Sequence, residues 1–217
     1  MLSVFTNFRL SVPVLAALAL WWLGCARPPD YTNFPPANPG DWVAFGDSLT
    51  AGHEMSPGQD YPAQLAARLG VPIRNEGVSG NTTQDGLGRV AALAATRPRV
   101  VLLCLGGNDG LRQLPRAETF GNLSAILEQL QSAGSFVVLI GVRSATIRDK
   151  NAEEFERLAK AQRALYVPNI LDGLLGKPSL MLDQIHPNEA GYAVIAERLE
   201  KMLRPLLPQL VAAPAGG

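Results

Sequence analysis

The chain has 217 residues, enough for one sizeable α/β domain and too few for two once an N-terminal segment is set aside. Its 19 basic and 19 acidic side chains are interspersed and give a formal net charge of zero. The sequence therefore lacks the basic surface typical of nucleic-acid-binding proteins, and we expect no nucleic acid among its partners.

Residues 1–25 have the pattern of a secretory signal peptide. Arg9 precedes an uncharged stretch, Leu10 to Gly24, which is shorter than the ~20 residues of a membrane-spanning helix. The end of the stretch, Leu23-Gly24-Cys25, resembles the lipobox of bacterial lipoproteins, in which the cysteine becomes the lipidated first residue. Trp22 stands where a lipobox usually carries leucine, so lipidation of Cys25 and simple cleavage nearby both remain open. We expect an exported bacterial protein, either periplasmic or attached to a membrane through its N-terminus.

The rest of the chain divides into a tether, one domain and a tail. Residues 26–40 contain five prolines and no helical or strand periodicity, which predicts an extended tether. Residues 41–207 are expected to form the domain. Residues 208–217 have no chemistry-bearing side chains and are predicted to be a disordered tail.

Short apolar runs alternate with amphipathic stretches from residue 41 onward. This alternation is typical of a parallel sheet covered by helices. Strands are predicted near 42–46, 72–76, 99–105, 135–141 and 164–168, and helices near 60–69, 82–96, 117–132, 152–163 and 188–204. The expected fold is a flavodoxin-like three-layer α/β/α sandwich with five parallel strands, in which ligands bind at the carboxyl ends of the strands.

The segment Gly46-Asp47-Ser48-Leu49 puts a serine directly after the first strand. A serine hydroxyl needs a base within hydrogen-bond reach to act as a nucleophile, and histidine is the side chain that ordinarily titrates near neutral pH. Of the two histidines, His186 has Asp183 three residues before it, which completes the parts of a Ser-His-Asp triad. The alternative for Asp183 to His186 is a surface turn that caps the last helix. His53 is interpreted as a solvated loop residue.

Two further segments follow strands and offer donors for an oxyanion. The candidates are the backbone N–H groups of Ser48 and Gly80 and the side-chain amide of Asn108. Gly80 could instead form an ordinary turn, and Asn108 an Asx-turn. Asp47 and Asp109 are expected to hold their loops by hydrogen bonds, and Arg112 to pair with an acid at the rim of the site.

Other chemistries find little support. Gly86 to Ala91 fits a loose dinucleotide-binding pattern, but the segment lies within a predicted helix and not at a strand-to-helix turn. The sequence has no Gly-x-Ser-x-Gly elbow, no His-Glu-x-x-His and no Cys/His cluster, so no cofactor or metal is expected. Cys104 lies inside a predicted buried strand, where it would act as a small apolar side chain.

Four segments in this order, Gly-Asp-Ser-Leu, Ser79-Gly80-Asn81, Gly106 to Asp109 and Asp183 to His186, resemble the SGNH (GDSL-type) hydrolase family. Gly77 to Gln84 and Gly106 to Arg112 are most similar to its bacterial arylesterases, acyl thioesterases and lysophospholipases. The resemblance implies that Ser48 is the nucleophile, that Gly80 and Asn108 are oxyanion-hole partners, and that Asp183 and His186 complete the triad.

The implied activity is hydrolysis of carboxylic esters or thioesters through an acyl-Ser48 intermediate, with a small-molecule or lipid ester as the substrate. An O-deacetylase of sugars or cell-wall polymers is the alternative, and a non-catalytic surface binding protein is a more distant one. Residues 143–151, where this subgroup usually carries a substrate-covering loop, have an unfamiliar sequence that leaves the preferred acyl chain length open.

Overall fold

A computed structural model describes residues 30–142 and 150–212. The chain divides into two compact units, Met1–Asp30 and Tyr31–Gly217, and the account below concerns the second. The predicted signal peptide and Cys25 lie outside the described residues. Within the described part of the chain, no helix is both long and apolar enough to cross a membrane.

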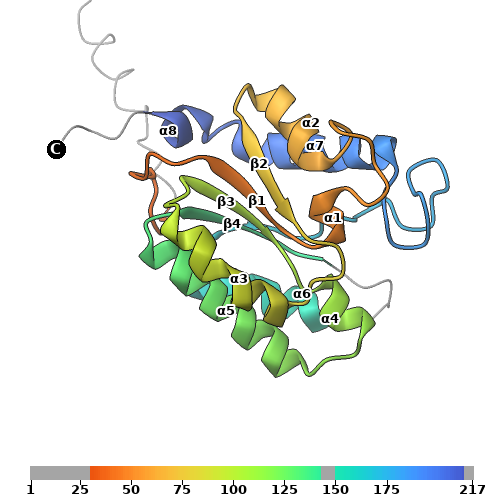
Figure 1. Cartoon of the computed structure of the whole chain (residues 1–217), viewed down its shortest axis with the longest axis horizontal. Helices are drawn as coiled ribbons and strands as arrows, with labels where there is room; N and C mark the ends of the chain where they lie inside the picture. Colours follow the sequence, from red (N-terminus) through yellow and green to blue (C-terminus); the bar gives the residue numbers. More distant parts are fainter. Residues whose placement is uncertain (1–29, 143–149, 213–217) are drawn as a thin grey trace, which may run out of the picture. The chain divides into compact units, whose positions relative to one another are not determined.

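The sheet has five parallel strands in the order β2-β1-β3-β4-β5, the flavodoxin-like order (Figure 1). The strands are β1 (Trp42–Gly46), β2 (Ile73–Gly77), β3 (Val100–Cys104), β4 (Phe136–Ile140) and β5 (Leu165–Val167). Strands β1, β3 and β4 are buried along their whole length, as expected when helices cover both faces of a parallel sheet. The predicted fold class is confirmed.

Helices cover both faces of this sheet, which makes three layers. Helices α2 (Tyr61–Leu69) and α7 (Glu189–Leu203) pack together on one face, and α3 (Thr83–Ala95), α5 (Arg116–Ser132) and α6 (Lys150–Ala161) cover the other. Side chains alternate along β1, so Trp42 and Ala44 belong to the core under α2 and α7, whereas Val43 and Phe45 belong to the core under α3 and α5.

Three short helices have no counterpart in the sequence prediction. They are α1 (Ser48–Ala51), α4 (Gly107–Leu111) and α8 (Leu207–Val211). None is longer than five residues. A helix of one turn is too short to show a hydrophobic period, so sequence periodicity could not reveal these three. Helices α1 and α4 follow β1 and β3 and carry two of the predicted site residues, Ser48 and Asn108.

The prediction of an extended tether over residues 26–40 is wrong for residues 31–40, which pack against the domain. The rings of Tyr31 and Phe34 pack edge-on or tilted against Phe136 at centroid distances of 5.9 and 5.4 Å. Asn38 is buried and donates to the carbonyl oxygens of Pro98 and Ala133. These aromatic and amide contacts offset the entropy of ordering a proline-rich segment.

The predicted disorder of residues 208–217 is also wrong at its start. Leu210, in α8, is fully buried against the core beneath α7. The Arg99 guanidinium donates from Nε to the carbonyl oxygen of Leu210 at 2.6 Å and also contacts the carbonyl oxygen of Ala212. One buried leucine and one buried arginine therefore fix this segment to the domain.

Candidate active site

Two glycines at strand ends let α1 sit tightly against the sheet. A Cβ added to Gly46 would lie 2.1 Å from Thr50 Oγ1 and 2.5 Å from the carbonyl oxygen of Cys104. A Cβ added to Gly77 would lie 2.2 Å from the backbone nitrogen of Ala51. Only glycine permits backbone approaches this close. The chain therefore turns from β1 directly into α1, and Ser48 begins that helix beyond the carboxyl end of the strand.

Asp47 supports this turn from inside the protein. Its Oδ1 accepts a hydrogen bond from the backbone N–H of Leu49 at 3.0 Å and so caps α1. Burial raises the pKa of the Asp47 carboxyl to about 7, the Leu49 bond lowers it in part, and the nearby Asp109 carboxyl raises it further. The residue before the candidate nucleophile is thus a buried acid that titrates near neutral pH.

His186 is held by the turn that leads into α7. The Asp183 Oδ1 atom accepts from the backbone N–H groups of Ile185 at 2.8 Å and His186 at 2.7 Å. The backbone N–H of Leu182 donates to the carbonyl oxygen of His186 at 2.8 Å. Asn188 then caps α7 through a bond from the N–H of Gly191. The turn does precede a helix, but it also fixes the direction of the imidazole.

Ser48, His186 and Asp183 form a continuous hydrogen-bonded series, which we call the candidate triad. Ser48 Oγ lies 3.0 Å from His186 Nε2, and His186 Nδ1 lies 2.7 Å from Asp183 Oδ2. When Nδ1 donates its proton to Asp183, the lone pair of Nε2 is free to accept the serine proton.

The charge of Asp183 is also favoured by its surroundings. Partial burial alone would raise the pKa of the Asp183 carboxyl, but the bonds from the His186 ring and from two backbone N–H groups outweigh it and lower the pKa to about 2. Asp183 is therefore ionised at any pH near neutrality. A fixed negative charge beside Nδ1 holds the tautomer and stabilises an imidazolium.

The three candidate oxyanion donors follow three neighbouring strands. Ser48 follows β1, Gly80 lies in the loop after β2, and Asn108 lies in α4 after β3. Gly80 has φ +82°, a left-handed backbone conformation that favours glycine. Asn108 Nδ2 donates to the carbonyl oxygen of Asn81 at 2.9 Å and lies 3.4 Å from Asp47 Oδ2. The amide is thus oriented from both sides.

The neighbouring polar residues behave largely as expected. Asp109 accepts from the backbone N–H and the hydroxyl of Thr83 at 2.9 and 2.5 Å, so it ties α4 to the start of α3. The Arg112 guanidinium donates to the carbonyl oxygen of Gly80 at 2.8 Å, a partner that the sequence did not predict, and its charge also acts on the Asp85 carboxylate. This bond holds the loop that carries one oxyanion candidate.

A pocket of about 370 Å³ opens beside the candidate triad. Ser48, Asn108 and His186 line it, together with the polar side chains of Asp47, Asn151 and Gln184. The apolar part of its wall comes from six side chains, Leu49, Leu111, Val142, Leu171, Leu175 and Ile185. A mostly apolar wall with a few converging polar groups is typical of a small-molecule site.

The interpretation of His53 as a solvated loop residue is only half correct. Its side chain is 36% exposed, but its ring lies against the His186 ring at a centroid distance of 4.2 Å and an interplanar angle of 32°. The backbone N–H of His53 also donates to the carbonyl oxygen of Ser48. The two histidines are 133 positions apart, so the sequence contained no signal of this contact.

Comparisons with known proteins agree with this geometry. Residues 44–194 match the family model described as the GDSL-like Lipase/Acylhydrolase family. The thioesterase 1/protease 1/lysophospholipase L1 of Escherichia coli (strain K12) is 34% identical over 174 residues, which cover 76% of this chain and 84% of that protein.

The chain belongs to the GDSL/SGNH hydrolase family. An arylesterase of Vibrio mimicus is 32% identical over 167 residues, covering 71% of this chain and 84% of that protein. A crystal structure of TesA has a TM-score of 0.72 at 29% identity and covers 76% of this chain and 99% of that one. This SGNH hydrolase therefore falls in the subgroup that its motifs resemble, and its class is that of enzymes acting on ester bonds.

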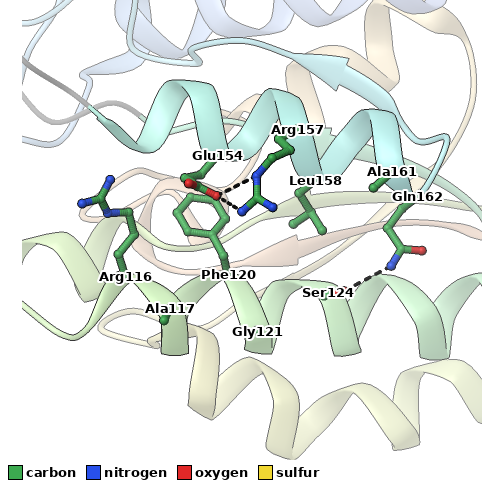
Figure 2. Close-up of a pocket in the computed structure, with 10 residues that line it drawn as sticks. All are labelled: Arg116, Ala117, Phe120, Gly121, Ser124, Glu154, Arg157, Leu158, Ala161 and Gln162. Atoms are coloured by element: carbon green, nitrogen blue, oxygen red, sulfur yellow. Dashed lines mark hydrogen bonds and ion pairs between the residues drawn. The ribbon is translucent and has the colours of Figure 1, made fainter.

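This SGNH hydrolase has a second hollow, of about 710 Å³, between α5 and α6 (Figure 2). Gln162 donates to Ser124 Oγ across it at 3.1 Å, and Arg157 pairs with Glu154 along α6. None of its ten lining residues belongs to the candidate triad or the oxyanion donors. The hollow between α5 and α6 therefore lies apart from the candidate chemistry at Ser48.

Proposed function

We propose that this SGNH hydrolase is a serine esterase that cleaves carboxylic esters or thioesters through an acyl-Ser48 intermediate. The observation that carries the proposal is the hydrogen-bonded series from Ser48 through His186 to Asp183 beside an apolar pocket. A protein that only binds its ligand has no need of a base aligned on a serine.

The first half of the reaction acylates the enzyme. Ser48 Oγ attacks the carbonyl carbon while His186 Nε2 takes the hydroxyl proton, and Asp183 stabilises the imidazolium. The negative charge that develops on the carbonyl oxygen is held by the N–H groups of Ser48 and Gly80 and by Asn108 Nδ2. The imidazolium then returns its proton to the departing alcohol or thiol.

The second half releases the acid. His186 Nε2 accepts a proton from water, the hydroxide attacks the acyl carbon, and the oxyanion is held by the same donors. When this intermediate collapses, Ser48 Oγ leaves and recovers its proton from His186. No other co-reactant is required, because water supplies both the oxygen and the proton.

The pocket supports an acyl substrate over a strongly charged one. Its apolar wall is built by leucine, valine and isoleucine side chains, so the acyl part would lie there and the alcohol or thiol part would face solvent. Relatives that are named thioesterase, lysophospholipase and arylesterase agree with an acyl donor whose leaving group varies.

A substrate panel tests the proposal. We expect hydrolysis of nitrophenyl esters and acyl thioesters, with kcat/KM depending on chain length, and complete loss of turnover in Ser48→Ala. When the reaction of the wild-type enzyme with a slowly hydrolysed ester is stopped rapidly, mass spectrometry should detect one acyl group on Ser48. Faster hydrolysis of acetylated sugars than of any acyl ester would favour the O-deacetylase instead, and turnover by Ser48→Ala would contradict the mechanism.

We further propose that the protein is exported and carries lipid on Cys25, with simple cleavage as the alternative. Support comes from the apolar stretch that ends at Leu23-Gly24-Cys25. The intact mass of membrane-extracted protein is expected to correspond to a chain that begins at Cys25 with added acyl groups. A mature chain without acyl mass on Cys25 would contradict lipidation.

A further inference from the structure

We propose that His53, His186 and Asp183 form a binding site for a divalent transition ion such as Zn²⁺, and that the bound ion inhibits the enzyme reversibly. One ligand atom from each of the three residues can be chosen so that all lie within 4.8 Å of one another. Two imidazole nitrogens and one carboxylate oxygen are the ligand set of many zinc sites.

The residues need only a small adjustment to reach coordination geometry. Ligand atoms around tetrahedral zinc lie roughly 3.4 Å apart, which follows from bonds of about 2.0–2.1 Å. Asp183 Oδ2 and His186 Nδ1 are already 2.7 Å apart, so the main movement is required of His53. Its side chain is 36% exposed, and the residue follows Gly52, the C-cap of α1. Rotation about its own side-chain bonds can turn the ring from its tilted contact with His186 to a converging position.

A fourth ligand is also close. The Glu54 carboxylate has one oxygen 3.8 Å from His53 Nε2, and its side chain is 68% exposed. Glu54 or a water molecule could therefore complete four coordination, and the ion would be reached directly from solvent. Magnesium and calcium prefer oxygen ligands, so a site with two imidazoles selects against them.

Inhibition follows from the two bonds that the His186 ring makes. Its Nδ1 donates to Asp183 and its Nε2 receives the Ser48 proton, with distances of 2.7 and 3.0 Å. An ion on Nδ1 would replace the bond to Asp183. The ring proton would then sit on Nε2, which could no longer accept the serine proton. An ion on Nε2 would occupy the lone pair that must accept the serine proton. Either coordination stops the base from working.

The chain provides a clean test, because it contains only two histidines. We expect micromolar Zn²⁺ to inhibit ester hydrolysis, chelator to restore it, and the same concentration of Mg²⁺ to have no effect. His53→Phe keeps a ring against His186 and removes the metal ligand. The Zn²⁺ concentration that halves the rate should therefore rise at least tenfold. Each variant is compared with its own rate in the absence of metal. Met55→Leu, in the same loop, is the matched control and should be inhibited like the wild type.

The inhibition experiment rests on the proposed function, because it needs esterase activity. A binding measurement does not need that activity and therefore tests the metal site separately. Calorimetric titration of Ser48→Ala with Zn²⁺ should show one site per chain with the wild-type affinity, and His53→Phe should bind at least tenfold more weakly. Equal binding by wild type and His53→Phe, or no binding at all, would overturn the metal site. Binding by Ser48→Ala together with an inactive wild type would instead overturn the esterase and leave the site intact.

Discussion

Asn108 has an amide that is held in place before any substrate arrives. One N–H is donated to the carbonyl oxygen of Asn81, and Asp47 Oδ2 lies 3.4 Å from the same nitrogen. The second bond is long, so a negatively charged oxygen in the pocket would compete well for that N–H. Asn108 can therefore serve the transition state without a rotamer change.

We expect Asn108→Ala to lower kcat by about 10²–10³ with little change in KM, because an oxyanion donor acts mainly in the transition state. Steady-state kinetics on a nitrophenyl ester measures this. Thermal unfolding of the variant should remain cooperative, since the side chain is only half-buried at the pocket. A folded variant with kcat within threefold of wild type would leave Asn108 as a loop-holding residue only.

Asp47 makes the free energy of unfolding of the protein depend on pH. Its pKa is about 7 in the folded protein against an ordinary 3.8, so between these values the folded state holds a proton that the unfolded state has released. The contribution of Asp47 to the free energy of unfolding is therefore complete at low pH and is lost as pH rises through this window.

Asp47→Asn removes this titration and keeps the cap, because asparagine caps helices as well as aspartate does. Denaturant unfolding at about pH 5 and about pH 7 should show the variant gaining roughly 2–3 kcal/mol relative to wild type at the higher pH. The comparison cancels the titration of all other groups. A difference between the two proteins that is the same at both pH values would show that Asp47 is already ionised in the folded state at about pH 5.

At the scale of elements, the ends of β1 and β2 determine where Ser48 lies. Helix α1 is only four residues long and is fixed from several sides. Thr50 Oγ1 is 3.0 Å from the hydroxyl of the fully buried Tyr61, and Asn75 Nδ2 donates to the carbonyl oxygen of Thr50 at 2.7 Å. A displacement of α1 would move the nucleophile away from His186.

Gly46→Ala should therefore reduce both stability and activity. Its Cβ would collide with Thr50 Oγ1 and with the backbone of Cys104, and relief of such overpacking costs about 1–3 kcal/mol. We expect kcat to fall at least tenfold, because about 1.4 kcal/mol of lost positioning has that effect. Unfolding curves and kinetics measured on the same preparation check both values.

Gly88→Ala is the matched control. Gly88 is exposed in α3 and a Cβ there meets nothing within 4 Å, so alanine should stabilise the helix by roughly 0.5–1 kcal/mol and leave the kinetics unchanged. Equal behaviour of the two glycine variants would mean that the approach of α1 to the sheet is not what positions Ser48.

At the scale of the whole domain, the candidate site lies at one edge of the sheet, and the segments just before β1 and just after α7 are attached at the opposite edge. Ser48 and Asn108 follow the carboxyl ends of β1 and β3, whereas Arg99 directly precedes β3 at its amino end. Arg99 is buried and donates to backbone carbonyl oxygens of Asn38, Leu210 and Ala212. A single guanidinium thus joins the segment before β1 to the helix after α7.

Truncation after Leu206 should lower the free energy of unfolding by about 2–5 kcal/mol, because it removes the buried Leu210 side chain and two of the carbonyl partners of Arg99. At a temperature where the shortened protein is folded, kcat/KM should stay within about twofold of wild type, since the site is at the other edge. Truncation after Ala212 is the control and should change neither quantity. If both truncations proved equally stable, α8 would add nothing to the fold.

Much of this molecule follows from its sequence. The alternation of short apolar runs with amphipathic stretches over residues 41–204 predicted five strands and five long helices close to the observed places, because burial on both faces of a parallel sheet leaves a strong local signal. The strand order also follows, since short connections with helical crossovers allow few alternatives. The predicted strands placed Ser48, Gly80 and Asn108 at one edge of the sheet, and the turn from Asp183 to His186 was expected to aim its imidazole at Ser48.

Only the tertiary structure decided what these residues touch. The stacking of His53 on His186, the bond from Arg112 to the Gly80 carbonyl and the docking of Tyr31 and Leu210 all join segments distant in the sequence. Such contacts depend on the direction of single side chains in loops and one-turn helices. These segments show no hydrophobic periodicity in the sequence, so their contacts cannot be predicted from it. Hydrophobic patterning sets which face of an element is buried, whereas the partner of a polar or aromatic side chain is set by where the chain returns in space.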